Sequence, residues 1–499
     1  MSLRLSLLGG AATLVLLCGA GPSPDPDRDA WLADYVTLKQ ALEAQYANLT
    51  WFASPQGDRD LPALDRRTTT ALKKAATAAD ARAALLAFQT AFRDGHFVGR
   101  ASPEPSPDEA VEPEWPDLKS SDPAAAACVA LGYGGAASPF SLPIETLPTF
   151  QLLSDGEAQP FRAGIVTSGL RRIGVVRIPT FAMVNYPALC RQSWTAEGVD
   201  DGGDVNQSAL ERAVARAWYA ELGGVLQTFR SRGVDAVLVD IGGNGGGDDS
   251  GDMATRLFTD RVIRSSPLLI KRGPAAETYL QEQIEQVEYG LTLEPTPAGA
   301  ALLSQVRDDL RRLDPARRPA DCDLTWVWQE QRTWDPSGGC DLVPVGSAGG
   351  PLAELDREVI PQTRIARRLS WAMNVKDLWG TWSGPVYVLI DGRTGSSAEM
   401  FAATLQNNRI AKVAGVESSG AGCGAMGPDG RVTLAGVSLT FSLPTCVRLR
   451  PDGSDEVAGV RPDVPIRPTA GESRRARAAR LFNAITSDLR ELASSSGPP

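Results

Sequence analysis

Residues 234–247 read VDAVLVDIGGNGGG, and residues 384–407 read GPVYVLIDGRTGSSAEMFAATLQN. In each stretch an apolar run leads into a glycine-rich turn, and the second turn is followed by a helical pattern. Continuous apolar runs of this kind are typical of strands that are buried on both faces. A further strand at 173–178 and a long helix from Leu210 to Phe229 come before the first stretch. This order of strands and helices predicts an α/β fold with its functional site at the strand ends.

The rest of the chain divides into regions around this core. Apolar residues at helical spacing predict a small helical bundle near the amino terminus, and a polar, helix-rich stretch interrupts the core as an insertion. The predicted regions in chain order are a signal peptide at 1–20, an N-terminal helical domain at 29–100, a linker and small β region at 101–170, a core at 171–466 with a large insertion at about 262–382, and a C-terminal helix and tail at 467–499.

The composition argues against several classes of protein. The chain has 499 residues with 60 acidic and 50 basic side chains, and its net charge of −10 argues against a nucleic-acid-binding surface. His96 is the only histidine and no Cys-x-x-Cys pair occurs, so no zinc or other metal site and no cofactor are expected. Beyond the amino terminus no run of 18 apolar residues occurs, so no stable membrane span is expected.

The first 20 residues, MSLRLSLLGGAATLVLLCGA, have an early arginine, an apolar run from Leu7 to Leu17 and small residues at the end. This layout is typical of a secretory signal peptide that is cleaved after Ala20, so we expect a secreted or periplasmic protein. A cell-envelope lipoprotein with Cys18 as the lipidated residue is the alternative, although Leu17 stands where such signals have a small side chain.

Six further cysteines remain after Cys18 is set aside. An even number in an exported chain favours disulfides, although six cysteines allow 15 pairings. Proximity in sequence suggests two pairs and leaves the third: Cys322–Cys340, Cys423–Cys446 and Cys128–Cys190. Buried free thiols are the alternative.

The first glycine-rich turn spans residues 242–247. Glycines let the main chain approach a ligand closely, and free N–H groups at such a turn favour an oxyanion-binding site. Asp248, Asp249 and Asp252 would repel a phosphate, and no lysine follows as a phosphate-binding loop requires. A calcium site built from these aspartates, or a plain turn whose aspartates cap a helix, are the alternatives.

The second turn presents Ser396 and Ser397 at the start of a helix. Ser396 and Glu399 have the spacing of a capping box, so a structural role in starting the helix is the alternative to a catalytic one. Ala398 occupies the place of the second glycine in Gly-x-Ser-x-Gly, which excludes the nucleophile turn of α/β-hydrolases.

Together the two turns resemble the C-terminal-processing (tail-specific) serine peptidase family and its tricorn-like relatives. The segment VDAVLVDIGGNGGG is similar to that family's strand followed by Asp-Leu-Arg-x-Asn-x-Gly-Gly, and residues 384–422 are similar to its nucleophile strand, loop and helix. The segment DEVAGVRPDVPI at 455–466 is similar to its closing motif, Glu-x-x-Gly-Val-x-Pro-Asp. The resemblance runs from about 171 to 466 and implies a crotonase/ClpP-like core of β-β-α units. The family's PDZ domain has no convincing counterpart here.

By this resemblance Ser396 is the nucleophile, Ser397 gives one oxyanion-binding N–H, and Gly246 or Gly247 gives the other. The lysine that usually serves as the family's base lies 25 positions after the nucleophile, and that position is Ala421 here. Lys412 is the nearest lysine and lies on the preceding predicted strand. The usual Ser-Lys dyad is therefore missing.

The resemblance to the branch of this family that uses histidine implies a different base. Its members carry Asp-Gly-His or a similar motif after the N-terminal helices and a late glutamate that orients the imidazole. Here Asp94-Gly95-His96 and Glu456 stand in those places. The alternatives are a solvent-exposed His96 and a plain loop carboxylate at Glu456, which has Asp455 beside it.

The sequence therefore predicts an exported serine endopeptidase that hydrolyses peptide bonds through an acyl-enzyme, with Ser396, His96 and Glu456 as its triad and a peptide or protein as its substrate. The alternative is a non-catalytic protein on the same fold that binds peptides or hydrophobic ligands. Acyl-CoA chemistry on the related crotonase fold is disfavoured by the export signal and by the lack of a basic patch. The sequence does not indicate the substrate's identity or the oligomeric state.

Overall fold

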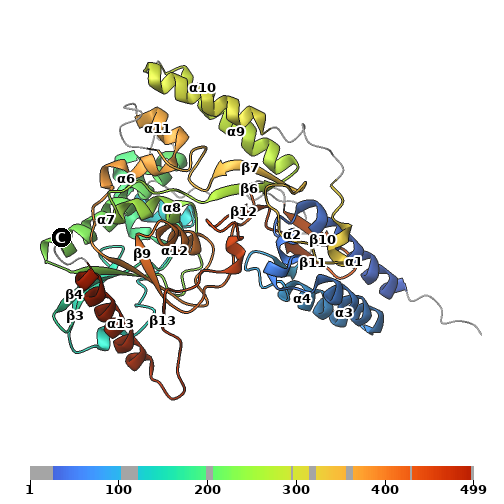
Figure 1. Cartoon of the computed structure of the whole chain (residues 1–499), viewed down its shortest axis with the longest axis horizontal. Coiled ribbons are helices and arrows are strands. Elements are labelled where there is room, and N and C mark those ends of the chain that lie inside the picture. Colours follow the sequence, from blue (N-terminus) through green and yellow to red (C-terminus); the bar gives the residue numbers. More distant parts are fainter. Residues whose placement is uncertain are drawn as a thin grey trace, which may run out of the picture.

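The computed structural model describes residues 26–102, 122–197, 206–293, 296–313, 322–355, 363–426 and 430–495. The predicted signal peptide at 1–20 and Cys18 lie outside these residues. The described strands form one sheet of seven strands and two sheets of three strands. Helices pack against all three sheets (Figure 1).

The seven-stranded sheet has the strand order β13-β9-β8-β5-β4-β3-β2. Its strands are β2 Phe150–Asp155, β3 Arg162–Ser168, β4 Arg171–Arg177, β5 Ala236–Asp240, β8 Val386–Ile390, β9 Ala411–Gly415 and β13 Val464–Pro465. The strands from β4 to β13 are parallel, whereas β2 and β3 pair antiparallel. All residues of β5 and β8 are buried, which confirms the prediction that these apolar runs form buried strands.

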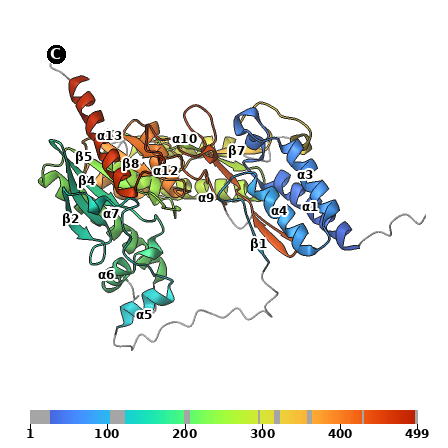
Figure 2. The same ribbon diagram turned by 90° about the horizontal axis from the view of Figure 1, so that it is seen from below.

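Alternate side chains of this sheet enter two different apolar clusters, because successive residues of a strand point to opposite faces. Val237, Val239 and Val388 pack on one face against helices, whereas Leu238 and Leu389 pack on the other. The first face is covered by α5 Pro123–Ala130, α6 Pro187–Glu197, α7 Gln207–Ser231, α8 Ser250–Ala254 and α12 Ser397–Asn407. The second face is covered by the C-terminal helix α13 Arg474–Ser495, dark red in Figures 1 and 2.

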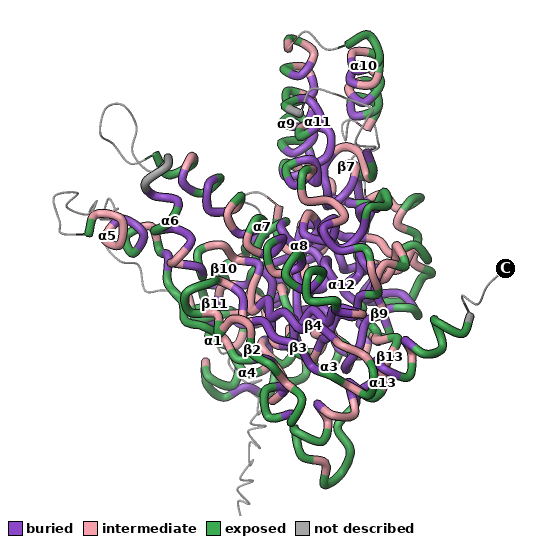
Figure 3. The backbone as a smooth tube through the Cα atoms, turned by 90° about the vertical axis from the view of Figure 1, so that its left-hand side faces the viewer, coloured by how far each residue is buried: buried purple, intermediate pink, exposed green. Residues whose placement is uncertain are grey.

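A second sheet carries a helical arm. Its strands, in the order β12-β6-β7, are β12 Cys446–Arg448, β6 Pro267–Lys271 and β7 Leu342–Ser347. The arm consists of α9 Pro274–Leu291, α10 Pro297–Arg312 and α11 Thr363–Leu369. Its apolar residues form a cluster with β6 and β7, and the arm stands away from the rest of the molecule in Figure 3. The sequence pattern indicates the surface helices of this region but not the strands β6 and β7.

The N-terminal helices form a unit with its own apolar core. They are α1 Pro26–Gln45, α2 Leu49–Phe52, α3 Leu61–Lys74 and α4 Ala78–Thr90. The third sheet, with β1 Val98–Ala101, β11 Leu439–Ser442 and β10 Arg431–Leu434, packs against them. Because β1 pairs with β11, the amino-terminal unit is joined to a hairpin from the far end of the chain. It lies to the right of the seven-stranded sheet in Figure 1.

The structure confirms the three predicted cysteine pairings, Cys128–Cys190, Cys322–Cys340 and Cys423–Cys446. The first joins α5 to α6, and the last joins a loop after β9 to β12. A search of the described helices for one with the length and apolar character of a bilayer span finds none.

Candidate active site

Two loops at the carboxyl ends of β5 and β8 lie against each other. The two strands are neighbours in a parallel pairing, so the turns that follow them leave the sheet at the same edge. The N–H of Gly243 donates to Asp391 Oδ1 at 2.8 Å, and the N–H of Gly395 donates to the Asn244 carbonyl at 2.9 Å. These bonds hold the glycine-rich turn beside the turn that carries Ser396.

The glycine-rich turn approaches Ser396 so closely that only glycine fits. A methyl group on Gly246 would lie 2.6 Å from Ser396 Cβ, and one on Gly247 would lie 2.1 Å from the Phe181 carbonyl carbon. Both glycines have positive φ, 106° and 154°. The N–H of Gly246 donates to Asn244 Oδ1 at 2.8 Å, and the Gly246 carbonyl accepts from Phe181 N at 2.9 Å. The sequence offered Gly246 or Gly247 as the second oxyanion-binding donor. Because the N–H of Gly246 already donates to Asn244, Gly247 is the better candidate of the two.

Ser396 has an uncommon main-chain conformation. Its φ of 55° and ψ of −123° lie outside the extended region that N-cap residues usually adopt. Such strain in a residue other than glycine is found at functional sites, where the surrounding structure holds it in place. The Glu399 carboxylate accepts the Ser396 N–H at 3.0 Å, so the predicted contact between these two residues is present. An ordinary helix cap does not account for the backbone of Ser396.

Ser397 is distinguished from Ser396 by its hydroxyl, which donates to the Asp248 carbonyl. Its side chain is buried, and the bond ties the start of α12 to the glycine-rich turn. As the first residue of α12, Ser397 has a main-chain N–H with no partner inside the helix. That nitrogen lies 2.9 Å from the Cβ position that Gly246 lacks, so it faces the same small space.

His96 is half-buried and is held by main-chain contacts on two sides. Its ring nitrogen Nδ1 lies 2.6 Å from the Ala421 carbonyl oxygen, and its main-chain N–H donates to the carboxylate oxygen Oδ1 of Asp94 at 2.9 Å. Because a carbonyl only accepts hydrogen bonds, this contact places a proton on Nδ1, and the main chain of Cys423 makes a further hydrogen bond with the ring. Burial lowers the pKa of His96 below its usual value, so the imidazole is neutral at neutral pH.

Ala421 lies between the residues that precede His96 and Ser396. Its Cβ is 2.9 Å from the Cβ position of Gly95 and 3.6 Å from that of Gly395. The chain segments that carry His96 and Ser396 therefore both pass close to Ala421, although no hydrogen bond joins Ser396 Oγ to the imidazole in the described residues. Catalytic hydrogen bonds are often long or poorly aligned in the absence of substrate.

Glu456 is fully buried and is paired with Arg448. Its Oε2 accepts from Arg448 Nε, whereas its Oε1 has no hydrogen-bond partner in the described residues. Arg448 also donates from Nη2 to the Gly422 carbonyl at 2.8 Å and to the Ser396 carbonyl at 3.4 Å. The charge of Arg448 lowers the pKa of His96, and that of Glu456 raises it. Glu456 therefore acts on His96 through its charge and not through a direct hydrogen bond.

Two further buried carboxyl groups flank these residues and are held by the N-terminal unit. Tyr46 donates its hydroxyl to Asp94 Oδ2 at 2.8 Å, and Asn48 donates its amide to Asp455 Oδ2 at 2.8 Å. Burial raises the pKa of Asp94 to about 7 and that of Asp455 to about 8. The N-terminal helices thus contact the residues next to both His96 and Glu456.

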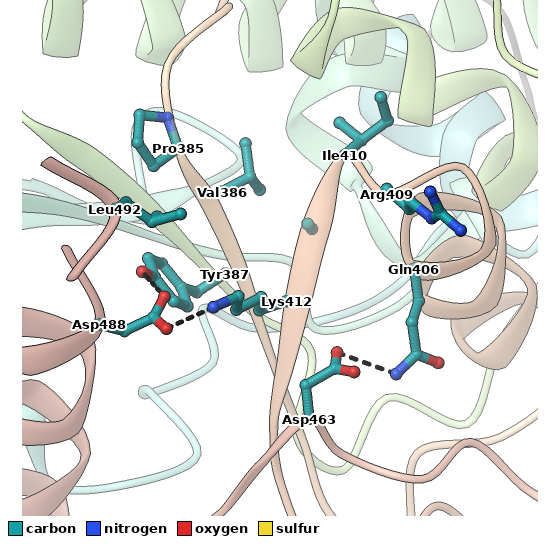
Figure 4. A pocket seen from close by; sticks show the side chains of 11 residues that line it. Pro385, Val386, Tyr387, Gln406, Arg409, Ile410, Lys412, Asp463, Asp488 and Leu492 are labelled. Atoms are coloured by element: carbon teal, nitrogen blue, oxygen red, sulfur yellow. Dashed lines mark hydrogen bonds and ion pairs between the residues drawn. The ribbon is translucent and has the colours of Figure 1, made fainter. Parts of the chain in front are cut away.

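Lys412 lies away from the candidate site. It is the second residue of β9, at the end of the sheet opposite to the two turns, and its ammonium pairs with Asp488 of α13. These residues line a cavity of about 320 Å³ together with Tyr387, whose hydroxyl also donates to Asp488 (Figure 4). Lys412 therefore has no access to Ser396, as the sequence suggested.

The aspartates after the glycine-rich turn do not form a metal site. Across the described ranges, no group of three or more His, Cys, Asp or Glu side chains is placed to hold a metal ion. Asp252 is buried and paired with Arg256, which also donates to Ser265. Asp248 accepts the Ser250 N–H, as in a turn that leads into α8.

Sequence reasoning did not find all residues of this cluster. It assigned no role to Arg448, which lies on a short strand whose residues are all buried. It treated Ala421 only as the place of a missing lysine, because a main-chain carbonyl leaves no signal in a sequence. It did not connect Tyr46 or Asn48 with the site, since each lies about 50 residues or more from its partner.

The comparisons with known proteins agree on one family and one fold. The family model described as Peptidase family S41 matches residues 172–466. The fold is similar to that of mature CPAF in two solved structures, one of them complexed with lactacystin. Both are 15% identical and cover 95% of this chain, with 99% and 100% of the CPAF chains covered and TM-scores of 0.56 and 0.55. A search of curated proteins gives no match.

Proposed function

Because the chain belongs to peptidase family S41 and is a serine peptidase, we propose that it is an exported endopeptidase whose nucleophile is Ser396, whose base is His96 and whose third member is Glu456. Its substrate is a peptide or protein, as for peptidases in general. This assignment replaces the usual lysine base of the family with an imidazole.

The observation that carries the proposal is the position of Ala421. The usual lysine would stand at 421, and the main chain of this residue instead accepts the proton of His96 Nδ1. Ala421 also donates its N–H to Glu399, which holds the N–H of Ser396. The imidazole of His96 is therefore bound to residue 421, the position at which the family usually has its lysine base.

The chemistry follows from the protonation state of His96. Its Nε2 lone pair takes the proton of the Ser396 hydroxyl while Oγ attacks the carbonyl carbon of the scissile peptide bond. The imidazolium then gives this proton to the leaving nitrogen, and the C–N bond breaks to leave an acyl-enzyme. A water molecule attacks the ester in the same manner, so the acid is released and both side chains return to their starting states.

The oxyanion of each tetrahedral intermediate needs two N–H donors. We assign these to Gly247 and Ser397, since the N–H of Gly246 is engaged by Asn244. Gly246 serves the site by leaving space beside Ser396. Removing one such donor typically costs about 3 kcal/mol of transition-state stabilisation.

Glu456 supports the imidazolium by its negative charge. The positive charge of Arg448 partly offsets the effect of this negative charge on His96. Glu456 is therefore expected to stabilise the imidazolium less than a carboxylate that is hydrogen-bonded to the ring would. Arg448 positions the loop at Gly422 and the main chain of Ser396.

Export is supported by the signal-like residues 1–20 and by the three disulfides, which persist in oxidising compartments. Amino-terminal sequencing of the mature protein tests this assignment. A terminus after Ala20 supports a secreted or periplasmic protein. A lipidated Cys18 supports the lipoprotein instead, and an intact Met1 in the cytoplasm contradicts export.

Labelling with a fluorophosphonate probe tests the catalytic assignment. Wild type is expected to be labelled and to cleave a denatured protein, whereas Ser396→Ala and His96→Ala are expected to do neither. Lactacystin, with which mature CPAF is complexed in one solved structure, is a second probe to test on Ser396. Lys412→Met is the matched control and should keep full activity, since its ion pair is partly exposed and far from the site. Labelling of Ser396→Ala would contradict the assignment.

A further inference from the structure

We propose that Glu399 is a positioning residue that sets the orientation of His96 through the main chain of Ala421, in addition to holding Ser396. A single buried carboxylate on the nucleophile's own helix would then fix both partners of the proton transfer. This role rests on the proposed function, because it assumes that His96 is the base.

The contacts of Glu399 exceed those of a helix cap. Its side chain is fully buried, and it accepts four hydrogen bonds. Oε2 accepts the N–H groups of Ser396 at 3.0 Å and Ala421 at 2.8 Å. Oε1 accepts the N–H of Gly420 at 2.8 Å and the hydroxyl of Ser418. A capping box needs only the first of these bonds, and the other three come from a loop 19 to 22 residues further along.

Burial makes these four donors necessary. A buried carboxylate is costly unless hydrogen bonds replace its hydration, and four donors match the capacity of its two oxygens. Burial raises the pKa of Glu399, whereas the hydrogen bonds from Ser418, Gly420 and Ala421 lower it. The charges of Glu456, Arg448 and Asp94 also act within this cluster. The loop at 418–421 is thus bound to Glu399 by charge-assisted bonds, which are the strong ones.

Ala421 connects the carboxylate of Glu399 to the imidazole of His96. Ala421 donates its N–H to Glu399 and accepts from His96 Nδ1 with its carbonyl, so a shift of Ala421 moves the acceptor of the imidazole proton. The loop has little freedom to compensate elsewhere. Gly420 and Gly422 both have positive φ, 74° and 54°, and a methyl group on either would lie 3.0 Å or less from a main-chain atom of Val457. The position of the Ala421 carbonyl therefore depends on the carboxylate of Glu399.

The variant Glu399→Gln keeps the shape of the side chain and removes acceptors. The amide oxygen of the glutamine can accept from two of the four donors, whereas its NH₂ group cannot accept from the other two. Part of the loop at 418–421 therefore loses its hydrogen bonds to residue 399. Because a displacement of about 1 Å at a catalytic group costs up to about 100-fold in rate, we expect kcat to fall by about 10- to 100-fold. KM should change little, since Glu399 is buried away from substrate.

Because His96 is the only histidine, its imidazole signals can be measured alone, and a general loss of stability would not change the position of its proton. In a chain labelled with ¹⁵N-histidine and carrying no added histidine, the only imidazole signals belong to His96. Wild type should show a neutral ring with the proton on Nδ1. In Glu399→Gln the Nδ1–H signal should weaken as the Nε2-protonated form appears, and the acid limb of kcat/KM should move to lower pH, because the Ala421 bond raises the pKa of His96.

Two variants complete the test. Ser418→Ala removes one donor to Glu399, together with the acceptor of the Val460 N–H, and should give a smaller change in the same direction, which keeps the inference testable if Glu399→Gln does not fold. Glu417→Gln is the matched control, because it makes the same change at an exposed neighbouring residue and should match wild type.

The outcomes separate this inference from the proposed function. Ser396→Ala should be inactive and should keep the Nδ1–H signal of wild type. If Ser396→Ala is active, the proposed function fails. If Ser396→Ala is inactive while folded Glu399→Gln and Ser418→Ala keep the wild-type imidazole signals and pH profile, the positioning role is overturned and the proposed function stands.

Discussion

Replacing Arg448 by methionine tests how the buried charges of the site depend on one another. Arg448 and Glu456 are both almost fully buried, and their pairing is the only hydrogen bond of the Glu456 carboxylate in the described residues. Removing one partner of a buried ion pair leaves an uncompensated charge and costs about 3–5 kcal/mol of unfolding free energy. We therefore expect Arg448→Met to lose stability in this range.

The double variant Arg448→Met/Glu456→Gln separates two roles of Glu456. With both charges removed, most of the lost stability should return, because the buried charge of Glu456 is no longer left without its partner. Activity should not return with it, since the carboxylate that supports the imidazolium is gone. In the single variant Arg448→Met the pKa of His96 should rise, because the charge of Arg448 lowers it.

Urea unfolding followed by tryptophan fluorescence measures the stability, and kcat/KM as a function of pH measures the activity. Arg264→Met is the control, because its pairing with Glu354 is exposed and should contribute no more than about 1 kcal/mol. A wild-type urea midpoint for Arg448→Met would refute the buried pair. Recovery of both stability and full activity in the double variant would refute the catalytic role of Glu456.

Three further predictions concern pH and the disulfides. The acid limb of kcat/KM for wild type should lie below pH 6.5, because burial lowers the pKa of His96; an acid limb above that value would contradict a buried neutral base. Asp94 and Asp455 keep their protons in the folded state up to about pH 7 and about pH 8, whereas in the unfolded chain they lose them near the ordinary pKa of 3.8, so the unfolding free energy should fall as pH rises through this window, from about 4 to about 8. Urea titrations on both sides of the window test this, and replacing both residues by asparagine should flatten the slope; stability that increases with pH would refute it. Replacing Cys423 and Cys446 by alanine should cost about 3 kcal/mol and also lower kcat, because this disulfide holds the loop that carries the acceptor of the imidazole proton. Removing the disulfide between α5 and α6 should lower stability alone, and an equal loss of kcat would contradict the special role of the first.

The central strands and turns could be predicted because their signals are local. Apolar runs at 236–240 and 386–390 are buried on both faces, and glycines mark the turns after them. The helix α5 and the strands β6 and β7 were not predicted. Their residues form these elements through tertiary contacts, namely the disulfide to α6 and the pairing of β6 with both β12 and β7.

The candidate site could be predicted only where a side-chain type is rare or a motif is distinctive. His96 stands out as the only histidine, and Ser396 stands out at the start of a helix after a buried strand. Arg448 is one of many arginines, and nothing in its neighbourhood indicates that its strand passes beside Ser396. The acceptor at Ala421 is a carbonyl that every residue has, so only the folded chain distinguishes it.

His96 and Ser396, the proposed base and nucleophile, belong to units with separate apolar cores. Phe97, next to His96, packs into the N-terminal helical core, whereas the helix that begins after Ser396 packs on the seven-stranded sheet. Tyr46 and Asn48 reach across to the carboxyl groups beside the site. If His96 is the base as proposed, a newly synthesised or partly unfolded chain has not yet brought its proton acceptor to the serine, and we expect it to have no peptidase activity before both units have docked.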